Sequence, residues 1–145
     1  MCGICGFAGN GDQDALEAMM ESMIYRGPDA AGIWTDQNGV YLGHRRLSIV
    51  DIADGHQPMV AEDDSLVLVF NGEIYNHREL RQDLESTGVI FRTDHSDTEV
   101  LLRGYRKWGC SVVDRLNGMW AFALLDRSEG VLWLSRDRFG KKPLY

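Results

Sequence analysis

Residues 65–76, which read SLVLVFNGEIYN, contain the stretch that decides the fold. Its first part is a short apolar run, Leu-Val-Leu-Val-Phe over residues 66–70, and such a run bounded by turn residues predicts a buried strand. We expect this strand to end at Asn71-Gly72, because the dipeptide is common in turns. The run continues into Glu73 and a predicted helix start, so Asn71-Gly72 is not the centre of a tight hairpin.

Further short strands are predicted on both sides of this stretch. Apolar and small or β-branched residues dominate them, and turn residues bound them. Asn38-Gly39 is a strong hairpin signal between two of them, and an extended run with two cations follows at 44–51. The predicted strands cover residues 2–8, 33–35, 40–42, 65–70, 89–91, 119–125 and 131–135.

Three helices are predicted between these groups of strands. Residues 13–25 place apolar side chains at helical spacing, and Gly27-Pro28 ends the pattern. Capping-box patterns open the other two helices, one at Asn76 that closes at Gly88 and one at Ser96 that stops at Gly109. Hairpin-connected strands with inserted helices are typical of an α+β fold with largely antiparallel sheets.

Composition narrows the class of protein. The 145 residues suffice for one domain with a sizeable core, and 44% hydrophobic with 26% charged residues is typical of a soluble globular protein. A net charge of −7 argues against a nucleic-acid partner, and no apolar run is long enough to span a membrane. Three cysteines do not make a disulfide framework, so we expect a cytoplasmic location.

Cys2 is the strongest candidate for chemistry. Removal of Met1 would leave a cysteine that carries both a thiol and a free α-amine, and the amine, with a pKa of about 7.7–8.0, could take the thiol proton. The alternative is that Cys2 and Cys5 form a C-x-x-C redox pair or half a zinc site. No upstream strand and no following helix support the redox site, and Cys110 has no partner that would complete a zinc site.

Four other residues could assist an amide-directed nucleophile. Asn71 and Gly72 could supply a side-chain amide and a backbone N–H to a developing oxyanion. Arg46 lies in a mostly apolar stretch, where its guanidinium would pair with a protein carboxylate or bind a substrate α-carboxylate. Asp97 lies in the first turn of a predicted helix. The helix dipole stabilises a carboxylate there, so Asp97 could be purely structural, or it could receive a substrate ammonium. Sequence spacing does not establish that these positions meet in space.

Motifs along the whole chain resemble one family. They are Met1-Cys2-Gly3-Ile4, Arg26-Gly27-Pro28-Asp29, Arg46-Leu47-Ser48-Ile49-Val50-Asp51, Asn71-Gly72-Glu73-Ile74-Tyr75-Asn76, Ser96-Asp97-Thr98-Glu99 and Arg136-Asp137-Arg138-Phe139-Gly140. In this order they resemble the N-terminal glutaminase domain of glutamine-hydrolysing asparagine synthetases, which are class II, N-terminal-nucleophile amidotransferases. The resemblance implies a four-layer αββα sandwich with antiparallel sheets.

The resemblance also implies the roles of the candidate residues. Cys2 would attack the carboxamide of L-glutamine, and Asn71 and Gly72 would form the oxyanion hole. Arg46 would bind the α-carboxylate. The amino end would lie against Asp97 and Glu73, and Ile49 and Val50 would line the site through their backbone.

Partners and cofactors follow from the same resemblance. No cofactor or metal is expected in residues 1–145, whereas ATP and Mg²⁺ belong to a C-terminal synthetase domain that amidates aspartate. That domain is the expected partner, and we consider a homodimer as the oligomeric state. The end at Tyr145 has no terminating signal, so we expect the glutaminase domain to be C-terminally truncated. Branches of the family that amidate sugars or peptides leave the ammonia acceptor open.

Overall fold

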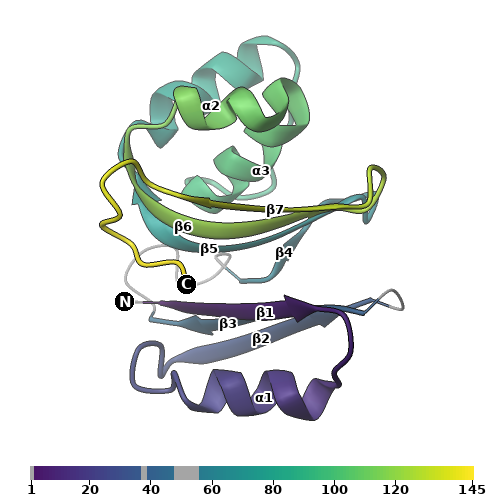
Figure 1. The fold of residues 1–145 in the computed structure, drawn as a ribbon. Coiled ribbons are helices and arrows are strands. Elements are labelled where there is room, and N and C mark those ends of the chain that lie inside the picture. The colour runs from purple at the N-terminus through teal and green to yellow at the C-terminus, as the bar shows by residue number, and fades with distance from the viewer. Residues whose placement is uncertain (1, 37–38, 48–55) are drawn as a thin grey trace.

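The computed structural model describes residues 2–36, 39–47 and 56–145 (Figure 1). Its strands form two antiparallel sheets, one of three strands in the order β1-β3-β2 and one of four in the order β4-β5-β6-β7. The first sheet contains β1 (Gly3–Ala8), β2 (Ala30–Thr35) and β3 (Val40–Arg46). The second contains β4 (Met59–Val60), β5 (Leu66–Ile74), β6 (Gly118–Asp126) and β7 (Val131–Arg136).

Helices cover the outer face of each sheet (Figure 1). Helix α1 (Gln13–Glu21) packs on the first sheet, and α2 (His77–Ser86) and α3 (Asp97–Trp108) lie over the second, followed by the 3₁₀ helix η1 (Gly109–Asp114). The layers therefore run helix, sheet, sheet, helix. This arrangement confirms the predicted α+β fold and the αββα sandwich. No helix in the described parts of the chain is long and apolar enough to cross a membrane.

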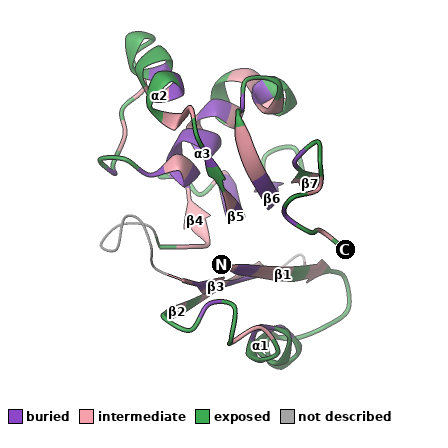
Figure 2. Ribbon diagram, turned by 90° about the vertical axis from the view of Figure 1, so that its left-hand side faces the viewer, coloured by how far each residue is buried: buried purple, intermediate pink, exposed green. Residues whose placement is uncertain are grey.

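The hydrophobic core has two parts, one on each face of strand β5. The side chains of β5 alternate between the two faces of the sheet, as in any β-strand. One face packs against α2 and α3, and Figure 2 shows buried residues along β5, β6 and α3. The other face meets the first sheet and contributes Val67 and Val69, which cluster with Leu42, Ala123 and Leu125.

The predicted end of β5 was wrong. The strand continues through Asn71 and Gly72 to Ile74, because β6 offers a partner at every position, from Asn71 opposite Ala121 to Ile74 opposite Gly118. A turn dipeptide is a local preference, and a full row of partners on a neighbouring strand overrides it. Asn71 and Gly72 are therefore held in a regular strand.

Two other predictions also need correction. Residues 89–91 form no strand, since the backbone N–H groups of Arg92 and Thr93 just beyond donate to the Glu99 carboxylate of α3. The capping box at Ser96 exists in part, with the Ser96 hydroxyl accepting from the Glu99 N–H. Asn76 is the N-cap residue of α2, but its side chain makes no capping hydrogen bond to the helix. Its side-chain amide instead donates to the Arg115 carbonyl and accepts from the Asn117 N–H, just ahead of β6.

Helix α1 is shorter than the predicted 13–25. It ends at Glu21, and the N–H groups of Met23 and Ile24 then donate to Met20 and Glu21, three residues back. Such bonds tighten the chain into turns that lead to Gly27 and β2. The Cβ of any residue at position 27 would collide with the backbone of Arg45, so glycine lets this connection run close to β3.

Candidate active site

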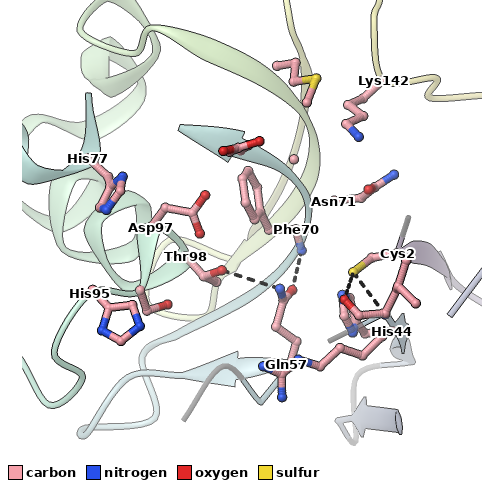
Figure 3. Close-up of a pocket in the computed structure, with 16 residues that line it drawn as sticks. Cys2, His44, Gln57, Phe70, Asn71, His77, His95, Asp97, Thr98 and Lys142 are labelled. Carbon is pink, nitrogen blue, oxygen red and sulfur yellow. Dashed lines mark hydrogen bonds between the residues drawn. The ribbon is translucent and has the colours of Figure 1, made fainter. Parts of the chain in front are cut away.

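A cavity of about 350 Å³ lies where the two sheets and the N-terminus of α3 meet (Figure 3). The residues that the sequence nominated and that line it are Cys2, Arg46, Asn71, Gly72, Glu73 and Asp97. They come from β3, β5, α3 and the residue ahead of β1, so the fold brings together positions that are far apart in the sequence. Ile49 and Val50 lie outside the described residues.

Cys2 is half-buried immediately before β1. Its sulfur accepts a hydrogen bond from the Leu47 N–H at 3.5 Å and lies 3.8 Å from the Leu47 carbonyl oxygen. This position follows from the antiparallel pairing of β1 with β3, which sets Gly3 opposite Arg45. The thiol is thus anchored at the end of β3, on the wall of the cavity.

Cys5 occupies a different environment. Its sulfur lies beside Gly43 and Met20, under helix α1, and burial raises the pKa of its thiol to about 11. The first sheet therefore separates the Cys5 thiol from the cavity that holds Cys2. The C-x-x-C spacing creates no joint site, and among the described residues no cluster of His, Cys, Asp or Glu has the geometry of a metal site.

Asn71 and Gly72 reach the cavity in two different ways. Asn71 shares a face of β5 with Val67 and Val69, which pack toward the first sheet, so its side chain points to the side from which Cys2 comes. Gly72 instead offers its backbone. In an antiparallel ladder successive residues turn their N–H groups to opposite edges of the strand, so every second residue points to the same edge.

The N–H groups of Phe70 and Ile74 both point away from β6, because they donate to the side chains of Gln57 and Asp97. The Gly72 N–H, midway between them, must point to the same edge and so into the cavity. A side chain at this position is excluded, since a Cβ on Gly72 would strike the Met119 carbonyl oxygen and lie 2.8 Å from the Phe70 ring.

Arg46 and His44 line the same wall from alternate positions of β3. Both are buried, at 7% and 1% exposed. Burial lowers the pKa of His44 to about 4, the charge of Arg46 acts in the same direction, and a hydrogen bond to the Phe70 backbone offsets part of the shift. His44 Nε2 has no hydrogen-bond partner among the described residues, so a neutral imidazole with an open acceptor faces this region.

The far end of the cavity is acidic. Asp97 Oδ2 accepts from the Ile74 N–H at 3.0 Å, and Glu73, His77 and His95 line the cavity nearby. Burial raises the pKa of Asp97, Glu73 adds to the rise, and the Ile74 N–H and the charge of His77 oppose it. A buried carboxylate gains most from a cation that replaces its lost hydration. This end of the cavity is therefore suited to an ammonium group.

Sequence reasoning missed several residues of the cavity wall. His44 could have been found, since it lies two positions before Arg46 in an extended run and so shares its face. Gln57 lies in a loop, where nothing local indicates where its side chain will point. Lys142 is buried in a loop whose backbone N–H groups, including its own, donate to Asp137. Asp137 lies in one of the family motifs, but nothing in the sequence indicated that Lys142 would reach the cavity.

Comparison with known proteins identifies the family of the chain and supports its fold. Residues 1–145 match the family model described as "Glutamine amidotransferase domain", so the chain belongs to that family. The solved structure of glutamine phosphoribosylpyrophosphate amidotransferase from Bacillus subtilis superposes with a TM-score of 0.73 at 23% identity, over 94% of this chain and 36% of that one. This likeness supports the fold.

Curated relatives narrow the branch of the family. The chain is 46% identical to glutamine-hydrolysing asparagine synthetase 1 of Bacillus subtilis and 40% identical to asparagine synthetase 1 of Arabidopsis thaliana. Another relative, a putative asparagine synthetase of Mycobacterium bovis, is 44% identical. Each match covers all of this chain and 24% or 25% of the relative, so the chain spans about a quarter of their length.

Proposed function

We propose that this domain hydrolyses L-glutamine to L-glutamate and ammonia through a thioester on Cys2. The observation that carries the proposal is that one cavity holds the Cys2 thiol, the Asn71 and Gly72 donors, the Arg46 guanidinium and the Asp97 carboxylate. A cation at one place and an anion at another match the two ends of a zwitterionic amino acid. The nucleophile and the amide donors match its side-chain carboxamide.

The reaction proceeds in two halves. The α-amine of Cys2, free once Met1 is removed, takes the thiol proton as the sulfur attacks the carboxamide carbon. Asn71 and the Gly72 N–H stabilise the oxyanion of the tetrahedral intermediate. The amine then returns the proton to the departing ammonia, and the sulfur remains acylated. A water molecule, deprotonated by the same amine, attacks the thioester and releases glutamate and the thiol.

Substrate binding uses the remaining residues. Arg46 holds the α-carboxylate in a two-pronged contact, and Asp97 with Glu73 receives the α-ammonium. The reaction itself needs no metal ion or cofactor.

The released ammonia is the substrate of a second, amidating reaction in this proposal. The names of the curated relatives support an acceptor of the asparagine-synthetase type. The family resemblance implies that this acceptor is aspartate, which a synthetase segment activates with ATP and Mg²⁺. A sugar or a peptide is the alternative acceptor. Incubation of the full-length protein with glutamine, ATP and aspartate tests this part, and glutamate release without asparagine would contradict it.

A direct test of the glutaminase uses mass spectrometry and kinetics together. The purified chain should lack Met1 and should carry one adduct on Cys2 after treatment with a diazoketone analogue of glutamine. Cys2→Ala should abolish glutamate release, and Cys5→Ala should retain it. Equal loss in both variants, or oxidation that removes two hydrogens at Cys2 and Cys5, would instead support a redox pair.

A further inference from the structure

Gln57 joins the neighbours of two residues that have been assigned to the substrate. Its amide oxygen accepts a hydrogen bond from the Phe70 N–H at 2.6 Å, and its amide nitrogen donates to Thr98 Oγ1 at 3.4 Å (Figure 3). Phe70 directly precedes Asn71, and Thr98 directly follows Asp97. One side chain therefore links the strand that carries the oxyanion donors to the helix that carries the ammonium receptor.

A second tie joins the same strand to the same helix. Asp97 Oδ2 accepts from the Ile74 N–H at 3.0 Å. Ile74 lies four positions beyond Phe70 along the strand, about 13 Å at the usual rise per residue. Asn71, Gly72 and Glu73 lie between the two ties, so both ends of this segment are fastened to the start of α3.

The backbone of Gln57 lies directly against the first sheet. A Cβ on Gly32 of β2 would collide with the Gln57 carbonyl oxygen, so this glycine allows the loop to lie directly on the strand. Gln57 thus contacts the first sheet through its backbone and the second sheet and α3 through its side chain. A rotation of α3 against β5 would break one of these contacts.

We propose that Gln57 is a positioning residue that sets the separation between the oxyanion donors and Asp97, and that it thereby selects a carboxamide on a two-methylene side chain. The proposal rests on the proposed glutaminase function. Glutamine and asparagine differ by one methylene, and an amide placed one methylene short of Cys2 cannot meet the nucleophile while its ammonium contacts Asp97. Fixing this span makes the cavity measure the length of the substrate.

The test compares Gln57→Met with the unchanged chain. Methionine has a similar length and removes both hydrogen bonds. We expect kcat/KM for glutamine to fall about 10–100-fold, because a misplacement near 1 Å has an effect of this size. The rate of Cys2 alkylation by the diazoketone analogue of glutamine should fall more than the rate with the asparagine-length analogue. The ratio of the two rates should therefore drop at least about fivefold.

Matched variants separate positioning from general stability. Thr98→Val removes only the hydrogen bond between Gln57 and Thr98 and keeps the one between Gln57 and the Phe70 N–H. It should lower the same ratio of alkylation rates by a smaller factor, and Thr98→Ser should restore the ratio. Gln82→Met, the same substitution at an exposed site on α2, should change neither rate. Hydrogen exchange of the Phe70 amide should accelerate in Gln57→Met, and it provides a readout that does not depend on activity.

Two results would overturn the inference. If Gln57→Met slowed both alkylation rates by the same factor, Gln57 would act on folding alone. If the Phe70 amide exchanged at the original rate, the tie would not exist. Absence of glutamate release from the unchanged chain would instead refute the proposed function, so the two failures are distinguishable.

Discussion

Gly72 has no room for a side chain, and its N–H is aimed at the cavity by the ladder it belongs to. The chemistry at this position therefore depends on a backbone group whose direction is set by the hydrogen bonds of its neighbours Phe70 and Ile74. His44, one layer away, shows the converse case of a side chain kept neutral by burial. At the scale of single residues, packing therefore sets both the direction of the Gly72 N–H and the neutral protonation state of His44.

Replacing Gly72 by alanine should damage activity more than stability. The added Cβ would push the strand away from the Met119 carbonyl, and overpacking of this kind costs about 1–3 kcal/mol. Alanine keeps the N–H, but the shifted strand moves it away from the oxyanion position, and the loss of one oxyanion donor's contact lowers kcat by about 10²–10³-fold. Steady-state glutaminase kinetics and urea unfolding measure the two effects.

Gly6→Ala is the matched control for that substitution. A Cβ there would strike the Tyr41 carbonyl oxygen of β3, and neither Gly6 nor Tyr41 is part of the cavity wall. It should cost a similar free energy of unfolding and leave most of kcat. A Gly72→Ala chain with unchanged kcat would contradict the assignment of its N–H as a donor.

Acid should destabilise the fold through His44. The folded pKa of about 4 lies below the reference value of 6.5, so the unfolded chain binds the proton more readily. The contribution of His44 is therefore complete above pH 6.5 and is lost as the pH falls toward 4, by up to about 3 kcal/mol. Urea unfolding at pH 7.5 and pH 5 measures the loss.

His44→Gln should remove this part of the pH dependence, although it lowers stability at neutral pH. His56→Gln, at an exposed histidine, should keep the pH dependence of the unchanged chain. Identical pH profiles for His44→Gln and the unchanged chain would show that the imidazole is not held neutral.

At the scale of elements, one carboxylate explains why an expected strand is absent. Glu99 of α3 is 2% exposed and accepts from the N–H groups of Arg92 and Thr93, from the Thr93 hydroxyl and from Arg103. Burial alone would raise the pKa of Glu99, but these donors lower it below its ordinary value. The chain ahead of α3 therefore binds to the helix, and its backbone is not available to a sheet.

Glu99→Gln should loosen this segment. The neutral amide has one acceptor oxygen in place of two, and a hydrogen bond to a charged group contributes about 1.5–3 kcal/mol. We expect a loss of at least about 2 kcal/mol in urea unfolding and faster hydrogen exchange at Arg92 and Thr93. Glu79→Gln, exposed on α2, should change stability by no more than about 0.5 kcal/mol. Equal effects of the two substitutions would contradict the role of Glu99.

At the scale of the molecule, the site exists only because two sheets face each other. Arg46 belongs to the first sheet and Cys2 directly precedes its strand β1, whereas Asn71 and Gly72 belong to the second sheet. The apolar cluster of Leu42 with Val67 and Val69 holds the two sheets together. The distance from Cys2 to Asn71 and Gly72 is therefore a property of the whole sandwich.

Leu42→Ala and Leu84→Ala should separate the effect of the contact between the two sheets from the effect of a general loss of stability. Both leucines are almost fully buried, and each truncation should cost about 2–5 kcal/mol. Leu42 lies between the sheets, whereas Leu84 of α2 belongs to the apolar cluster on the other side of the second sheet. Where both variants remain folded, Leu42→Ala should slow alkylation of Cys2 by the glutamine analogue, and Leu84→Ala should leave the rate nearly unchanged. Equal rates in the two variants would contradict the dependence of the site on sheet contact.

The sequence by itself determined most of the elements and nominated the candidate residues of the site. Apolar runs predicted β5, β6 and β7, helical spacing predicted α1, and capping boxes predicted α2 and α3. Motifs nominated Cys2, Arg46, Asn71, Gly72 and Asp97. These signals lie in adjacent residues, so they can be read locally. Only the tertiary structure decided that β5 runs through Asn71 and Gly72, that residues 89–91 are no strand, and that Gln57 ties strand to helix. Each of these depends on partners tens of residues away, and no local pattern encodes where such partners will lie.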